Sequence, residues 1–251
     1  MFEFAQTNVQ LYRQMDEAGY SLSERERVAS AYRFLMPMFS GQYRGNEKPF
    51  IAHLVGTASI LVSNRQPITL VLAGVLHAVY MSGDFGFQPG TRQTQRKRRC
   101  IRNLAGAEVE AVVAAYDDMR WDAESLKIYL SSDKTMSDQL RSAVTLQLAN
   151  TLEDFLDHGV NYCAGLKFDT YSSAEMQAEL IALCRRYGWP ELCSRLEQAL
   201  ANFNAGATAV GREGFMGQSA LLLPPIARRK LLPTSRGWLV RRMRRIMATF
   251  K

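Results

Sequence analysis

The chain has 251 residues, and 47% of them are hydrophobic, which is enough apolar material for one substantial core. No apolar run approaches the ~20 residues that a membrane-spanning helix needs. The N-terminal residues 1–6 lack the basic and apolar regions of a signal peptide, and the four cysteines show no CxxC spacing. These features argue against a helical membrane protein, a disulfide-stapled secreted domain and a cysteine zinc site. We therefore expect a cytoplasmic protein with reduced, buried thiols.

The net charge of +7 comes from one end of the chain. Residues 224–251 hold nine of the 31 basic residues and no acid, which leaves residues 1–223 with 22 basic and 24 acidic residues. The body is therefore close to neutral, while the tail is strongly cationic. This division predicts separate roles for the two parts.

Helical periodicity dominates the sequence, and no convincing alternating strand exceeds four residues. A capping box from Ser23 to Glu26 predicts a helix that runs to about residue 38. Pro49 and Pro67 suit the first turns of helices that end near residues 62 and 80. Further helices are predicted over 92–104, 107–119, 137–157, 174–187 and 190–203.

Breaker residues divide the chain into three parts. Residues 1–204 are predicted to form one all-helical domain, and residues 205–235 an irregular linker rich in Gly and Pro. Residues 236–251 are predicted to form a basic amphipathic helix.

This terminal helix carries apolar residues at the spacing of one continuous helical face, with Trp238 at its start. The residues of that face are Leu239, Met243, Ile246, Met247 and Phe250. Four arginines (Arg241, Arg242, Arg244 and Arg245) fall largely on the other sides. This composition is typical of a helix that lies on an anionic membrane surface. A helix docked on the body, a homo-oligomer contact and an RNA-binding arm are the competing interpretations.

A second basic stretch runs from Arg92 to Arg102. We interpret it as a solvated helix face, because it lacks interleaved aromatic residues and the body has a near-neutral balance. Nucleic acid is accordingly an unlikely partner. His158 stands just before Gly159, where it is interpreted as a C-terminal helix cap.

Two histidines stand on successive apolar helical segments. His53 ends the segment FIAH (50–53), and His77 lies within VLHAVY (75–80). Asn150 interrupts a third apolar segment, LAN (148–150). Imidazoles that converge from different helices are suited to holding a divalent cation or to moving protons near neutral pH.

This layout resembles the HD superfamily of metal-dependent phosphohydrolases, and most closely the hydrolase half of the RelA/SpoT alarmone enzymes. The resemblance covers roughly residues 30–160. The segments that carry it are YRGNEKPFIAH (43–53), LAGVLH (72–77), IRNLAGAEV (101–109) and LQLANTL (146–152). It implies an all-α, HD-domain-like helical bundle, to which the basic C-terminal amphipathic helix is appended.

The chain departs from the family at functional positions. The family has an Asp after its second histidine and another Asp on the later helix, where this chain has Ala78 and Asn150. The family's two acids four and five residues after that histidine correspond to Met81 and Ser82. Losing negative ligands weakens divalent-cation binding. The metal site is therefore predicted to be degenerate.

Other polar residues complete the candidate site. His53, His77, Tyr80, Asp84 and Asp154 are candidates for catalysis, and the two acids are possible replacements for the missing carboxylates. The candidates for ligand binding are Arg44, Lys48 and Asn150. The resemblance implies that Arg44 lies near a nucleotide. Arg44 and Lys48 can also be interpreted as solvated loop charges. Tyr80 can be interpreted as a core phenol and Asp84 as a turn residue.

Two functional hypotheses follow. In the first, the protein has lost standard metal-dependent phosphohydrolase activity, needs no cofactor, and acts as a binding or accessory protein, in the cytoplasm or peripherally on the membrane. In the alternative, an active enzyme reuses the pocket around His53 and His77 for phosphohydrolase-type or acid–base chemistry on a small, phosphorylated substrate. A weakly bound Mn, Fe or Zn ion, held by His53 and His77, belongs to this alternative.

Overall fold

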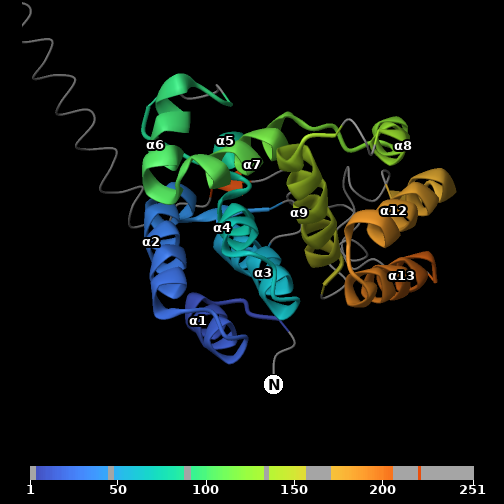
Figure 1. The fold of residues 1–251 in the computed structure, drawn as a ribbon, viewed down its shortest axis with the longest axis horizontal. Coiled ribbons are helices and arrows are strands. Elements are labelled where there is room, and N and C mark those ends of the chain that lie inside the picture. The colour runs from blue at the N-terminus through green and yellow to red at the C-terminus, as the bar shows by residue number, and fades with distance from the viewer. Residues whose placement is uncertain are drawn as a thin grey trace, which may run out of the picture.

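The computed structural model describes residues 4–44, 48–87, 92–132, 136–156 and 171–205, together with the backbone of 220–221. The helices are α1 (Asn8–Glu17), α2 (Leu22–Phe39), α3 (Phe50–Ser63), α4 (Ile68–Leu76), α5 (Val79–Ser82), α6 (Gln95–Ala105), α7 (Ala107–Asp118), α8 (Ala123–Ser131), α9 (Asp138–Phe155), α12 (Ala174–Tyr187) and α13 (Pro190–Asn204). The prediction of an all-α fold is confirmed (Figure 1).

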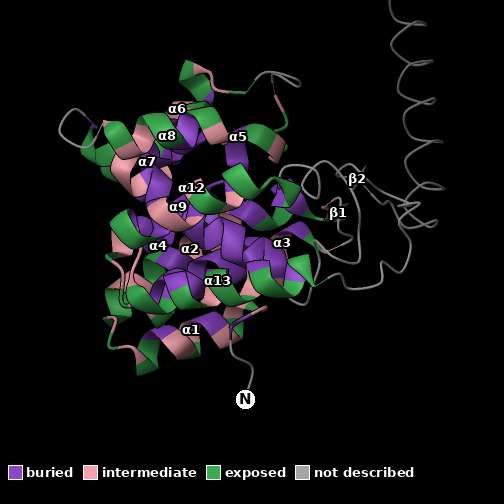
Figure 2. Cartoon of the chain, turned by 90° about the vertical axis from the view of Figure 1, so that its right-hand side faces the viewer, coloured by how far each residue is buried: buried purple, intermediate pink, exposed green. Residues whose placement is uncertain are grey.

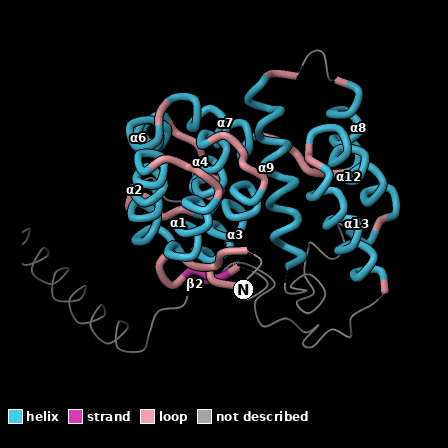
Figure 3. The backbone as a smooth tube through the Cα atoms, turned by 60° about the horizontal axis from the view of Figure 1, so that its bottom comes forward, coloured by secondary structure: helices cyan, strands magenta, loops and turns pink. Residues whose placement is uncertain are grey.

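The core is built around α3, α4 and α9. Helices α3 and α4 pack together, and both contact α9. Figure 2 shows buried residues concentrated in this part of the bundle. Helix α9 also contacts α12 and α13, so that it stands between the group formed by α1–α4 and the α12–α13 pair (Figure 3). Residues on α9 can therefore meet residues from both sides of the domain.

The only strands in the described part of the chain are two residues long. Strand β1 (Gln42–Tyr43) pairs antiparallel with β2 (Ala220–Leu221), which lies in the predicted linker. The rest of that linker, His158 and the predicted terminal helix 236–251 lie outside the described residues. No described helix is both long and apolar enough to cross a membrane.

Several predicted boundaries were wrong. The capping box of α2 is Ser21 with Glu24, two residues earlier than predicted, because the Ser21 side chain accepts from the Glu24 backbone amide. Helix α1, capped by a second box at Thr7 and Gln10, was not predicted, and neither was α8. The helix predicted to end near residue 80 divides into α4 and α5, and His77 stands at the break.

The basic stretch on α6 is not simply a solvated face. Arg98 and Arg102 both donate hydrogen bonds to Glu110, a buried carboxylate on α7 that also accepts from the Tyr80 hydroxyl. Arg92, just before α6, is paired with the buried Asp117. The sequence did not predict these partners because Glu110 and Asp117 lie on a separate helix. These ion pairs attach α6 to α7.

Burial alone would raise the pKa of Glu110, but the hydrogen bonds from Arg98 and Arg102 hold that pKa below its ordinary value. The stabilisation is therefore present above the carboxyl's ordinary pKa and is lost as the pH falls below it. We expect Glu110→Ala to lower the free energy of unfolding by about 2–3 kcal/mol at neutral pH, because it leaves a buried tyrosine hydroxyl and two arginines without their acceptor.

Denaturant unfolding measures this loss. The control is Arg102→Ala, whose side chain is 48% exposed and whose removal should cost under about 1 kcal/mol. Equal losses for the two variants would contradict a central role for the carboxylate.

Candidate functional site

The two histidines face each other inside the core. His53 lies on α3 and His77 ends α4, and both residues are at least 98% buried. Their Nε2 atoms are 3.1 Å apart. The Nδ1 atom of His77 lies 2.7 Å from the Gly74 carbonyl oxygen. Since a carbonyl only accepts, Nδ1 of a neutral His77 carries the proton, and its Nε2 is then a hydrogen-bond acceptor that faces His53.

Close packing of α3 on α4 produces this approach. A Cβ atom at Gly74 would lie 2.7 Å from Leu61 Cδ1 and 3.4 Å from the Ala58 Cα. Glycine at this position therefore lets the two helix backbones approach and brings the imidazoles into hydrogen-bond range.

Helix α9 adds three polar side chains to the histidine pair. Asn150, Glu153 and Asp154 are spaced so that they share one helical face, and all three are buried. The Glu153 carboxylate contacts Nδ1 of His53. This contact resembles the carboxylate partners that orient imidazoles in metal and acid–base sites.

Two cations from the segment before α3 neutralise these acids. Lys48 forms an ion pair with Glu153, and Nη1 of Arg44 lies 2.7 Å from the Asp154 carboxylate. The same Nη1 is 2.7 Å from Nε2 of His53. The two basic side chains are only 14% and 15% exposed. They are therefore not solvated loop charges, because each contributes to a largely buried charge cluster.

The cluster occupies an environment that disfavours ionisation. Burial raises the pKa of Glu153 to about 8, with Lys48 acting in the opposite direction. Burial, aided by the charge of Asp154, also raises the pKa of the Tyr116 and Tyr171 phenols. The Tyr116 ring packs edge-on against His77. The site is thus enclosed by apolar and aromatic side chains on several helices.

Asn150 differs from its neighbours because its buried side-chain oxygen has no hydrogen-bond partner among the described residues. The residue as a whole is 4% exposed. An unpaired buried acceptor of this kind costs about 1–3 kcal/mol.

The structure separates the remaining candidates from the histidine pair. The Tyr80 hydroxyl donates to Glu110, in the cluster that joins α6 to α7. The exposed Asp84 accepts a hydrogen bond from the Gly86 amide, as a turn residue does. Ala78 is buried and has no donor atom for a cation, and Met81 is 58% exposed.

Glu153 is the residue that sequence reasoning missed. It falls three residues after Asn150, at the spacing of the same helical face, within a segment that is otherwise largely apolar. This spacing is the signal in the sequence that places Glu153 beside Asn150.

A divalent cation fits the site only in part. Two nitrogens bound to one ion at right angles lie about 3.0 Å apart, close to the observed 3.1 Å. Ligand atoms of His53, Glu153 and Asp154 all lie within 4.8 Å of one another. However, Arg44 and Lys48 already neutralise the acids, and Asn150 offers a neutral oxygen. His53 and the two acids thus have the spacing that an ion needs, but both acids are already paired with cations.

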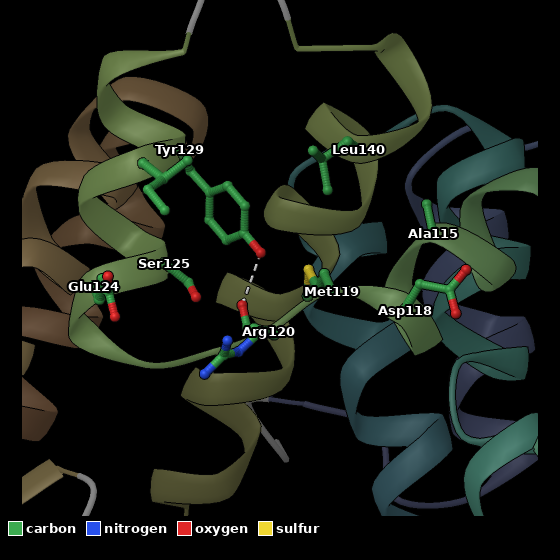
Figure 4. A pocket seen from close by; sticks show the side chains of 9 residues that line it. Ala115, Asp118, Met119, Arg120, Glu124, Ser125, Tyr129 and Leu140 are labelled. Atoms are coloured by element: carbon green, nitrogen blue, oxygen red, sulfur yellow. Dashed lines mark hydrogen bonds between the residues drawn. The ribbon is translucent and has the colours of Figure 1, made fainter.

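A separate cavity of about 520 Å³ lies between the end of α7, α8 and the start of α9 (Figure 4). Met119, Tyr129 and Leu140 line it, and the Tyr129 hydroxyl donates to the Arg120 carbonyl oxygen at 2.8 Å. None of the candidate catalytic or ligand-binding residues predicted from the sequence lines this cavity.

Comparison with solved structures identifies the class of fold. The chain is similar to a metazoan SpoT ortholog described as hydrolysing ppGpp and having a role in starvation responses, with a TM-score of 0.50 and 15% identity. The match covers 70% of this chain and 94% of that one. The all-α, HD-like bundle is therefore confirmed. At this identity the similarity establishes the fold and leaves the activity open.

More specifically, residues 34–120 match a family model described as a domain of unknown function, DUF6817. This stretch includes both histidines, Arg44 and Lys48, but it ends before α9 and its acids. No curated protein gives a significant match.

The contact between Gly56 on α3 and Glu153 provides a test of the site's packing. A Cβ atom at position 56 would lie 2.8 Å from Glu153 Oε1. We expect Gly56→Ala to lower the free energy of unfolding by about 1–2 kcal/mol, because overpacking outweighs the gain in helix propensity. Combined with Glu153→Ala, the loss should be smaller than the sum of the single losses by about 1 kcal/mol.

Gly188→Ala is the control, since its new Cβ would meet the Cys184 carbonyl oxygen on α12 and not Glu153. Its loss should add independently to that of Glu153→Ala in denaturant unfolding. Additive losses for Gly56→Ala and Glu153→Ala would show that Gly56 and Glu153 are not in contact.

Proposed function

We propose that this chain is a divergent HD-like protein that has lost standard metal-dependent phosphohydrolysis and acts as a binding or accessory protein. The observation that carries the proposal is the position of Arg44. Its Nη1 lies 2.7 Å from both His53 Nε2 and the Asp154 carboxylate, in the place that a cation bound by both would take.

The charge balance supports this proposal. Arg44 and Lys48 bring two positive charges to two carboxyl groups, the same charge that a divalent cation would bring. Moving an ion into the site would therefore require one or both side chains to leave partners in a largely buried environment, where separated charges are costly. In this proposal, Arg44 and Lys48 neutralise the two carboxyl groups in place of a metal ion.

The reacting groups of the family are also missing. Ala78 offers no carboxylate beside His77, and Met81 and Ser82 replace the two acids that the family places next. The chain therefore has no carboxylates at these positions to orient or deprotonate a water molecule.

A small phosphorylated ligand is the binding partner that we propose. Arg and Lys side chains recognise phosphate oxygens, and a phosphate group of the ligand would take Arg44 and Lys48 from their carboxylate partners. The unpaired oxygen of Asn150 requires a hydrogen-bond donor, which a hydroxyl or amino group of such a ligand supplies. Attachment of the tail to an anionic membrane surface remains part of the proposal for residues 236–251.

A second function is favoured by one observation. His53 is held by Glu153 at Nδ1 and faces His77 at Nε2, which is the arrangement of an oriented proton carrier. An enzyme that uses this pair for acid–base chemistry, with a displaced Arg44, is the alternative.

Metal analysis tests the replacement of the metal by Arg44. We expect protein purified without chelators to contain well under one equivalent of Mn, Fe or Zn per chain. Arg44→Ala should increase Mn²⁺ binding measurably, because Asp154 then loses a positive partner. The control Arg27→Ala, whose guanidinium bonds the distant Ala105 carbonyl, should bind no more than the unchanged protein. Near-stoichiometric metal in the unchanged protein, lost on His77→Ala, would overturn the proposal.

Hydrolysis of guanosine tetraphosphate tests the lost activity directly. We expect no pyrophosphate release above background, with or without added manganese. The double substitution Ala78→Asp with Asn150→Asp should restore little, since residues 81 and 82 still lack carboxylates. Pyrophosphate release that depends on His77 would establish the enzyme alternative instead.

A further inference from the structure

Two thiols touch on the side of the domain away from the histidine pair. Cys184 on α12 and Cys193 on α13 have their Sγ atoms 2.9 Å apart. Cys184 is fully buried, and Cys193 is 8% exposed. The only other cysteine in the described residues is Cys100 on α6, which is partly exposed.

The turn between the two helices holds these thiols together. Helix α12 ends at Tyr187, and α13 begins at Pro190, which suits a first helical turn. The Gly188 amide donates to the Cys184 carbonyl oxygen at 2.8 Å. A Cβ atom at position 188 would lie 2.6 Å from that oxygen and 3.0 Å from the Cys184 Sγ. Glycine thus allows the tight turn that brings Cys193 back against Cys184.

The packing on both sides of the turn fixes the two helices. Leu180 and Leu183 on α12 and Leu192 and Leu196 on α13 are all buried in the core. The Tyr187 carbonyl also accepts from the Thr145 hydroxyl on α9. The thiols are therefore held in contact by structure that does not depend on them, so a bond between them needs little rearrangement of the helices.

We infer that Cys184 and Cys193 are a reversible dithiol–disulfide pair that hydroperoxides oxidise. The Cys193 thiolate attacks the peroxide O–O bond, which gives a sulfenic acid on Cys193 and an alcohol or water. The Cys184 sulfur then attacks the Cys193 sulfur, forming the S–S bond and releasing water. The two thiols lose two electrons in total, and the peroxide bond gains them.

The order of the two steps follows from the surroundings of the thiols. Both thiols are buried, but Cys193 keeps 8% of its surface exposed, whereas Cys184 keeps none. Burial raises the pKa of the Cys184 thiol, so Cys184 stays protonated and unreactive until the sulfenic acid forms beside it. Cys193 is thus the residue that is oxidised first, and Cys184 resolves the sulfenic acid.

Treatment of the folded, full-length protein with hydrogen peroxide tests this pair. After quenching, the free thiols are alkylated in denaturant and the peptides are mapped by mass spectrometry. We expect a linked peptide that joins Cys184 to Cys193, and a fall in free thiols from the four in the sequence to two per chain. Dithiothreitol should restore all four.

Single substitutions separate the two roles. Cys100→Ser should form the same linked peptide, whereas Cys184→Ser should leave a Cys193 sulfenic acid that dimedone traps. Cys193→Ser should give at least tenfold less of the trapped product. Linkage of Cys100 or Cys163 in place of this pair would overturn the inference, as would unchanged thiols in the folded protein under conditions that oxidise the denatured chain. The peroxide experiment on the unchanged protein tests the inference even if a serine variant fails to fold.

Discussion

Two carboxyl groups on α9 lie buried beside a pair of imidazoles, and the rest of the site is arranged around this concentration of charge. Isolated carboxylates in such surroundings are costly, so they require partners or protons. Lys48 and Arg44 provide partners, the Glu153 carboxyl group also contacts His53 Nδ1, and burial still raises the pKa of Glu153. Arg44 and Lys48 are thereby attached to the core.

The positions of the helices follow from the same requirement. Gly74 allows α3 and α4 to approach until the histidines meet, and Gly56 leaves room on α3 for the Glu153 side chain. In a metal-bound HD site, an ion links the helices that carry its ligands. Here hydrogen bonds and ion pairs join α3, α4 and α9 in that way. His53 and His77 therefore take part in contacts that join these three helices.

The sequence predicted the helical class correctly, because apolar periodicity is a local signal. The family's motifs pointed to both histidines, and the fold brings His53 close to His77 and Asp154, while the roles of these residues stay predictions. It did not predict that Tyr80 turns toward Glu110, since that partner comes from a different helix. Glu153 was missed for a related reason. Its role depends on Lys48 and His53, which are about 100 residues away in the chain and meet it only in the fold.

Asn150 carries a buried side-chain oxygen that has no hydrogen-bond partner in the described part of the chain. Arg44, Lys48, His53 and His77 all have partners in the site. Leaving a buried acceptor unpaired costs stability. The Asn150 oxygen is thus the acceptor to which the proposed ligand would donate a hydrogen bond.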